Sequence, residues 1–171
     1  MSTTNCAEAW PVSNRIPNTR AVLALREHGV EFEGHFYKYS KDSVTKAAAG
    51  ELGVPEHSVV KTLVMEDSEG NPMIVLMHGD MRVSTRALAR LLGVKTTGTV
   101  DPKTARRLTG YLIGGISPFG TRRALDVYLE ETILKLQRLF INGGRRGFLL
   151  EMSPEDLVKV LKPTVVNVAI P

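Results

Sequence analysis

The sequence lacks the features that would mark a secreted, disulfide-stabilised or membrane protein. Its 171 residues include one cysteine, Cys6, so no disulfide can form within them. No basic stretch followed by an apolar one opens the sequence, and no apolar run approaches the roughly 18 residues that a membrane-spanning helix needs. We therefore expect a cytoplasmic protein without a disulfide framework and without a membrane partner.

Neither apolar nor charged residues are scarce. They make up 43% and 23% of the sequence, which is ordinary for a globular domain, and the length suits a single one. The first residues carry Pro11 and Pro17 and show no periodicity. We therefore predict an N-terminal arm over residues 1–17 and one domain over residues 18–171.

Hydrophobic periodicity predicts many strands with short helices between them. Without a regular alternation of strand and helix, this pattern favours an α+β fold with a mixed or largely antiparallel sheet. A Gly-Gly turn is expected at 143–144, and Leu88, Leu91 and Leu92 are expected to face inward. Helices are predicted from the N-cap Asn18 to Gly29 and over 44–53, 84–93, 101–110 and 153–161, and strands over 30–39, 58–66, 73–80, 94–100, 124–130, 135–142, 147–152 and 164–170.

The clearest hairpin, over residues 58–80, places a lysine among apolar neighbours. The two-residue period of a strand puts Lys61 on the same face as Val59, Leu63 and Met65. A buried ammonium is costly and has a lowered pKa, and such lysines often take part in chemistry. The alternative is a lysine that extends along the strand and reaches solvent.

A glycine-rich stretch, GGISPFG at residues 114–120, is the second notable feature. It lacks the Gly-Lys-Ser/Thr of a phosphate-binding loop and the spacing of a dinucleotide fingerprint, so a nucleotide-phosphate site is disfavoured. An open glycine turn does allow a close backbone approach, and it can direct N–H groups at oxygen atoms. By itself the stretch is equally compatible with a structural turn.

Conventional catalytic and metal-binding patterns are missing. Ser84 and Ser117 have no His-Asp partners at a recognisable spacing, and the histidines form no metal-ligand pattern. We therefore expect neither a metal nor another cofactor. The net charge of +4 and the arginine pairs at 106–107, 122–123 and 145–146 favour an anionic partner, with solvated surface charge as the alternative.

Three separated strings resemble one known family. TGYLIGGISPFG, with VVKTLV upstream and INGGRRGFLLEMSPEDL downstream, resembles the YbaK/EbsC family of aminoacyl-tRNA deacylases, which is related to the editing domain of bacterial prolyl-tRNA synthetase. The likeness extends over about 18–170. It implies a mixed, mostly antiparallel, barrel-like sheet with surrounding short helices, and hydrolysis of the ester of a mischarged tRNA.

The resemblance also implies which residues form the site. A lysine and open backbone N–H groups would stabilise the oxyanion of the ester, and a misattached cysteine could attack its own ester with its thiol. The implied catalytic residues are Lys61, Gly114, Gly115, Ser117 and Pro118; those for substrate binding are Tyr37, Val44, Ile116 and Asn142; those for tRNA binding are Arg122, Arg123, Arg145 and Arg146.

Some positions depart from the family pattern. Val44 replaces a pocket phenylalanine, and Asn142 and Leu149 replace a serine and an aspartate.

The expected substrate is Cys-tRNA(Pro) or another small amino acid on tRNA(Pro), with Ala and Ser as alternatives to Cys. The expected partners are the tRNA acceptor end and, as a further candidate, prolyl-tRNA synthetase. A non-catalytic module that binds tRNA or a synthetase is the alternative function.

Overall fold

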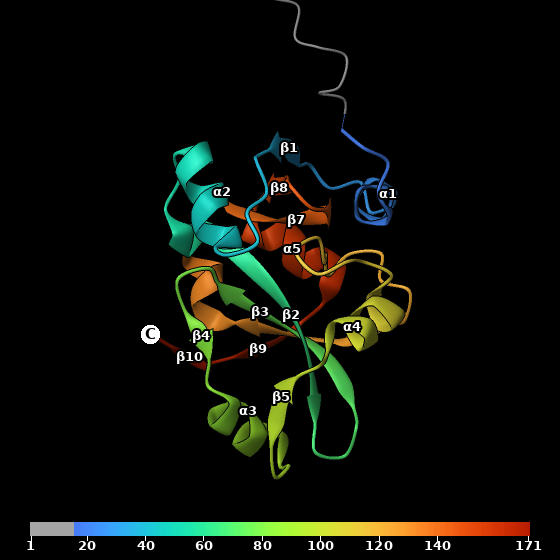
Figure 1. Ribbon diagram of the computed structural model, residues 1–171, viewed down its shortest axis with the longest axis vertical. Helices are drawn as coiled ribbons and strands as arrows, with labels where there is room; N and C mark the ends of the chain where they lie inside the picture. Colours follow the sequence, from blue (N-terminus) through green and yellow to red (C-terminus); the bar gives the residue numbers. More distant parts are fainter. Residues whose placement is uncertain (1–15) are drawn as a thin grey trace, which may run out of the picture.

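The computed structural model describes residues 16–171, so Cys6 and nearly all of the predicted arm lie outside the described residues. Short helices and strands follow one another along the chain without a repeating unit (Figure 1). They are α1 (Arg20–Glu27), β1 (Glu33–Phe36), α2 (Val44–Leu52), η2 (Glu56–Ser58), β2 (Val59–Asp67), β3 (Pro72–His78), β4 (Arg82–Val83), α3 (Thr85–Leu92), β5 (Thr97–Thr99), α4 (Pro102–Thr109), β6 (Asp126–Glu130), η3 (Glu131–Lys135), β7 (Leu139–Arg145), β8 (Phe148–Met152), α5 (Pro154–Leu161), β9 (Thr164–Val166) and β10 (Ala169–Ile170).

The fold is α+β with a mixed, mostly antiparallel sheet, as the sequence predicts. The strands of the main sheet run in the order β1-β8-β7-β2-β3-β6-β9, with β5 added beside β2. The hairpins β2–β3 and β7–β8 are antiparallel, whereas β2–β7, β3–β6 and β6–β9 are parallel. Strand β2 extends from the end of the molecule that holds β7 and β8 to the end that holds β5 (Figure 1).

Strand β2 connects the hydrophobic clusters of the core. Val60 and Val64 belong to the largest cluster, beneath α1 and α4, and Met65 belongs to one beside α3. Val59 packs in a third cluster with residues of α2. The alternation of side chains predicted for β2 is therefore the alternation observed. Because one strand supplies all three clusters, we retain a single domain over 18–171 as a proposal.

The helix ends follow local capping rules, with one correction. Ser84, Asp101 and Ser153 each accept a hydrogen bond from a backbone N–H of the first turn. The predicted cap Asn18 is wrong by one residue, because the Thr19 hydroxyl accepts from Val22 N–H at 3.1 Å.

Three expectations about faces and turns are corrected. Leu91 on α3 is 51% exposed rather than inward, because the buried stripe of this short helix is Leu88 and Ala89. The pair 143–144 lies within β7, and the turn follows at 146–147. The segment 164–170 forms two strands in different sheets, because β9 pairs with β6 and β10 pairs with β4.

Candidate functional site

One pocket of about 320 Å³ gathers residues from distant parts of the sequence. It brings together six of the residues predicted for the site: Tyr37, Val44, Lys61, Gly114, Ile116 and Asn142. Its other lining residues are Thr45, Ala48, Val59, Val60, Thr62, Leu63, Ile113 and Leu149. Most of this lining is aliphatic, so the pocket suits a small group with few polar atoms.

The pocket lies where one edge of β2 has no neighbouring strand. On one edge β2 pairs with β7 only at Val59 and Val60, and with β5 only from Met65 to Asp67. Between these two pairings, residues 61–63 border the pocket. The main chain of β2 is therefore accessible to a ligand at the place where Lys61 stands.

Lys61 is half-buried, and its ammonium donates a hydrogen bond to the carbonyl of Met81. Burial lowers the pKa of Lys61 below its usual value, although the carboxylates of Glu56 and Asp80 partly oppose this shift. Lys61 is thus neither fully buried nor free in solvent: its side chain is partly desolvated, and the hydrogen bond to Met81 holds its ammonium in place. A positioned cation at a pocket wall can stabilise negative charge on a ligand.

The glycine loop forms the facing wall, and its three glycines, Gly114, Gly115 and Gly120, are all closely surrounded. Gly114 has φ +85°, and a Cβ there would lie 2.5 Å from the Tyr39 hydroxyl. A Cβ on Gly115 would lie 2.9 Å from the backbone nitrogen of Arg146. The loop backbone thus packs directly against Tyr39 and against the β7–β8 turn, which no larger residue would permit.

The N–H groups of this loop differ in their availability. Gly115 N–H already donates to Leu112 C=O at 2.9 Å. Gly114 and Ile116, which line the pocket, donate to no acceptor within residues 16–171. These two N–H groups are therefore the ones that could bind a ligand oxygen.

Asn142 and Arg146 hold the loop in position. The Asn142 amide donates to Gly114 C=O at 3.0 Å, and its oxygen accepts from Gly144 N–H at 2.7 Å and Arg145 N–H at 3.1 Å. Arg146 Nε donates to Ile113 C=O at 2.8 Å, and its guanidinium lies 5.1 Å from the centre of the Tyr39 ring. Both side chains fix the position of the loop through hydrogen bonds to its carbonyl groups. The sequence around Asn142 and Arg146 does not indicate this role.

The remaining predicted loop residues lie outside the pocket. Ser117 is fully buried, and its hydroxyl accepts from Phe119 N–H at 3.3 Å. Gly115 and Pro118 are buried as well and do not line the cavity. These three residues support the loop from beneath rather than face a ligand.

The four predicted tRNA-binding arginines are all exposed, in two places. Arg145 and Arg146 border the β7–β8 turn, against which Gly115 packs. Arg122 and Arg123 follow the glycine loop, and their N–H groups donate to Thr109 and Leu108 C=O, which ties this segment to α4. One arginine pair therefore lies at the β7–β8 turn beside the glycine loop, and the other lies on the segment that follows the loop.

Sequence reasoning missed several pocket residues that carry no motif. Thr45 and Ala48 reach the pocket from α2, and Thr62 follows Lys61 in β2. The hydroxyls of Tyr37 and Thr62 are buried without a hydrogen-bond partner in the described part of the chain. Burial raises the pKa of Tyr37, so this phenol is neutral near pH 7. Only the position of Thr62 beside Lys61 could have drawn attention to it.

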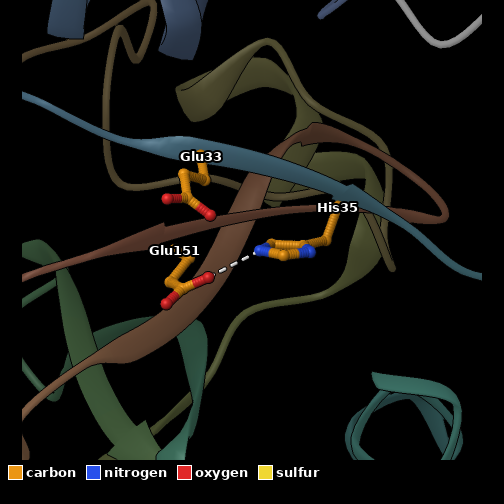
Figure 2. A group of neighbouring side chains, drawn as sticks. All are labelled: Glu33, His35 and Glu151. Carbon is orange, nitrogen blue, oxygen red and sulfur yellow. Dashed lines mark hydrogen bonds and ion pairs between the residues drawn. The ribbon is translucent and has the colours of Figure 1, made fainter.

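A second group of polar side chains lies across β1 and β8. The ligand atoms of Glu33, His35 and Glu151 all lie within 4.8 Å of one another (Figure 2). Glu33 stands directly opposite Glu151, and His35 Nε2 is 2.7 Å from Glu151. Arg138 Nε also donates to Glu151 at 3.2 Å. With a histidine and an arginine already on this carboxylate, the group is explained as an ion-pair cluster.

The other histidines have partners of their own. His78 is fully buried, with its ring nitrogens on the carbonyl of His57 and on the hydroxyl of Thr132. His57 stacks on it at 3.6 Å and bonds Asp80 at 2.9 Å.

In the part of the chain that the structure describes, no helix is long and apolar enough to cross a membrane.

Comparison with known proteins gives this site a context. The model of the aminoacyl-tRNA editing domain matches residues 41–160. EbsC of Enterococcus faecalis, provisionally named a Cys-tRNA(Pro)/Cys-tRNA(Cys) deacylase, is 26% identical over 143 residues, or 83% of this chain and 87% of EbsC. The proline–tRNA ligase of Geobacter metallireducens is 30% identical over 93 residues, which are 54% of this chain and 16% of the ligase.

A solved structure shares the fold. It is described as a provisionally assigned trans-editing enzyme for prolyl-tRNA synthetase, and it matches with a TM-score of 0.77 at 26% identity. The match covers 89% of this chain and 96% of the other. The fold is therefore shared over most of both chains.

Proposed function

The chain belongs to the aminoacyl-tRNA editing domain family, and on this premise we propose that it hydrolyses the ester bond of mischarged aminoacyl-tRNA as a trans-editing deacylase. The preferred substrate in this proposal is Cys-tRNA(Pro) or tRNA(Pro) charged with another small amino acid. The names of EbsC and of the trans-editing structure support this choice of substrate.

The observation that carries the proposal is the meeting of Lys61 and Gly114 at one small pocket. Ester hydrolysis develops negative charge on the carbonyl oxygen, which the N–H groups of Gly114 and Ile116 and the ammonium of Lys61 could share. Loss of one such donor typically reduces the rate about 100- to 1,000-fold. Lys61 could equally anchor a phosphate or the ribose at the tRNA 3′ end.

The aliphatic wall formed by Val44, Ala48 and Leu149 supports a small acyl group. Within that class, one methylene group changes the discrimination by only about 1–3 kcal/mol, so Cys, Ala and Ser remain competing substrates. For Cys, the substrate thiol would attack its own ester carbonyl and expel the ribose hydroxyl of the tRNA 3′ end, and water would then open the cyclic thioester. This route fits a pocket whose lining contains no serine or cysteine nucleophile among the described residues.

Deacylation of tRNA(Pro) charged with Cys, Ala or Ser tests the proposal. We expect the wild-type protein to release at least one of them, and Lys61→Ala to lose that activity at least 100-fold. Lys95→Ala, which removes an exposed lysine between α3 and β5, is the control and should retain it.

Each other result has a defined meaning. If the wild-type protein binds tRNA but releases none of the three amino acids, the non-catalytic binding module is the better account. Full activity in Lys61→Ala would remove Lys61 from the catalytic set. Dependence on added prolyl-tRNA synthetase would identify the synthetase as a partner.

A further inference from the structure

The main chain of Thr62 faces the pocket. In an antiparallel strand, the N–H and C=O of alternate residues point to the same edge. On the open edge of β2, Val60 takes part in the pairing with β7, and Val64 C=O accepts from Val100 N–H at 3.1 Å. Thr62 lies between them with no strand beside it, so its N–H and C=O point into the opening.

The strand β7 turns away from Thr62 for a local reason. The β2–β7 pairing ends at Ile141, and an irregularity in β7 follows between Asn142 and Arg145. The N–H groups of Gly144 and Arg145 donate to the Asn142 side chain instead of to a neighbouring strand. The irregularity therefore opens the edge of β2 at Thr62.

Two hydroxyls at the pocket add to this unpaired main chain. The oxygens of Tyr37 and Thr62 are buried and have no partner within residues 16–171, and Tyr37 is only 7% exposed. Burying a hydroxyl without a hydrogen bond reduces stability, so such groups usually have a partner. Both residues line the pocket, where a ligand can supply that partner.

The charges of the lining indicate the kind of ligand group. No described residue that lines the pocket is a carboxylate, and Lys61 is the charged one. An amino group in this pocket must therefore be bound by neutral oxygens. Among the described side chains, the buried oxygens without a partner are the hydroxyls of Thr62 and Tyr37. The C=O of Thr62 faces the same opening.

We propose that Thr62 is a substrate-binding residue whose carbonyl and hydroxyl, together with the Tyr37 hydroxyl, bind the α-amino group of the aminoacyl ester. This inference rests on the deacylase function proposed above. It names the substrate class more closely, as esters of amino acids with a free α-amino group. N-acylated esters, which offer one donor fewer and more bulk, are poor substrates.

The test compares two substrates and three variants. The substrates are tRNA(Pro) carrying the amino acid that the wild-type protein releases fastest, with its α-amino group free or N-acetylated. We expect the wild-type protein to prefer the free amine. Thr62→Val should lower kcat/KM for the free amine about 10-fold or more and leave the N-acetylated rate unchanged. Thr62→Ser should retain most of the preference, and Tyr37→Phe should reduce it.

A stability measurement separates this role from a structural one. Because Thr62→Val removes a hydroxyl that has no partner, we expect Tm to stay the same or to rise by about 2–4 °C. Thr99→Val, at an exposed position of β5 in the same sheet, is the control and should leave kcat/KM for both substrates unchanged.

The possible results separate a failure of the proposed role of Thr62 from a failure of the proposed deacylase function. A wild-type protein that releases no amino acid contradicts the proposed function and the inference together. An active protein whose preference is the same in Thr62→Val contradicts the inference alone. A clear fall of Tm in Thr62→Val would also overturn it, since the hydroxyl would then have a partner inside the protein.

Discussion

At the residue scale, the site depends on a glycine whose neighbours leave no room for a side chain. A Cβ on Gly114 would lie within 2.8 Å of three atoms of the Tyr39 phenol, and its φ of +85° is itself unfavourable for other residues. Because Tyr39 also lies under Arg146, a shift of its ring would disturb the segment that supports the loop. The shape of the loop at the pocket therefore depends on a glycine at position 114.

We expect Gly114→Ala to lower deacylation at least 10-fold by displacing Tyr39 and turning the loop N–H groups away from the ester. The strain at positive φ should also cost about 1–2 kcal/mol of stability. Kinetics and thermal unfolding measure the two effects. The matched control is Gly70→Ala, which has φ +82° and open space around the Cβ. It should show the loss of stability without the loss of activity, and equal activity losses would contradict the role of Tyr39.

At the scale of elements, the irregular end of β7 connects three parts of the site. Asn142 joins the glycine loop, through Gly114 C=O, to the backbone of Gly144 and Arg145. The pairing of β7 with β2 ends next to this residue, at Ile141. Asn142 therefore lies where the glycine loop and the open edge of β2 meet at the pocket.

Asn142→Leu removes all three of these hydrogen bonds while keeping a similar volume. We expect a loss of about 1–3 kcal/mol in the free energy of unfolding, and a fall in deacylation of at least 10-fold. Urea unfolding and steady-state kinetics provide the measurements. Asn142→Asp keeps the acceptor for Gly144 and Arg145 but loses the donor to Gly114. It should therefore be stable but poorly active, and unchanged activity would contradict a role in loop position.

The pairing of β1 with β8 depends on pH through Glu151. Burial by itself raises the pKa of Glu151, but hydrogen bonds from His35 and Arg138 outweigh it and hold the pKa below its usual value. A carboxylate with a lowered pKa stabilises the fold above its unfolded pKa of about 4.3, and this contribution is lost as the pH falls through the folded pKa.

Accordingly, we expect Glu151→Gln to lower Tm by about 2–4 °C at pH 7, and this difference to shrink as the pH falls toward 3. Thermal unfolding from pH 7 to pH 3 measures the difference from the wild-type protein. Glu69→Gln, in the exposed β2–β3 turn, should show no such trend. A difference that persists unchanged at pH 3 would mean that packing, rather than the charge, is lost.

At the scale of the whole molecule, exposed arginine pairs lie on two segments next to the glycine loop. Arg145 follows the irregular end of β7, next to the glycine loop, whereas Arg90 lies on α3 at the opposite end of the molecule (Figure 1). If the acceptor end of tRNA approaches the pocket, the first arginine meets phosphates and the second does not. Phosphate contacts release bound counterions, which makes affinity depend on salt.

We expect Arg145→Ala to weaken tRNA binding and to reduce the slope of log affinity against log salt by about 1. Arg90→Ala should leave both unchanged. Binding titrations at several salt concentrations decide between them. If the two variants have the same slope as the wild-type protein, Arg145 is solvated surface charge and the approach of tRNA must be placed elsewhere.

The sequence by itself determined the local structure of the protein. Side-chain caps begin α3 and α4, and positive-φ glycines end them. The turn at 67–72 joins β2 to β3, and the two-residue period places Lys61 on its face. These features depend on backbone angles and on neighbours within a few residues, which a pattern of letters can encode. The family resemblance added the fold and the loop.

Tertiary structure decided what the pocket consists of. Ser117 lies in the core rather than the cavity, Asn142 holds the loop, and Thr62 reaches the pocket because β7 leaves β2 at Ile141. Each of these depends on which distant segments pack together and where a ladder of hydrogen bonds ends. Such contacts join residues up to 124 positions apart, as for Thr19 and Gly143, and no local pattern specifies them.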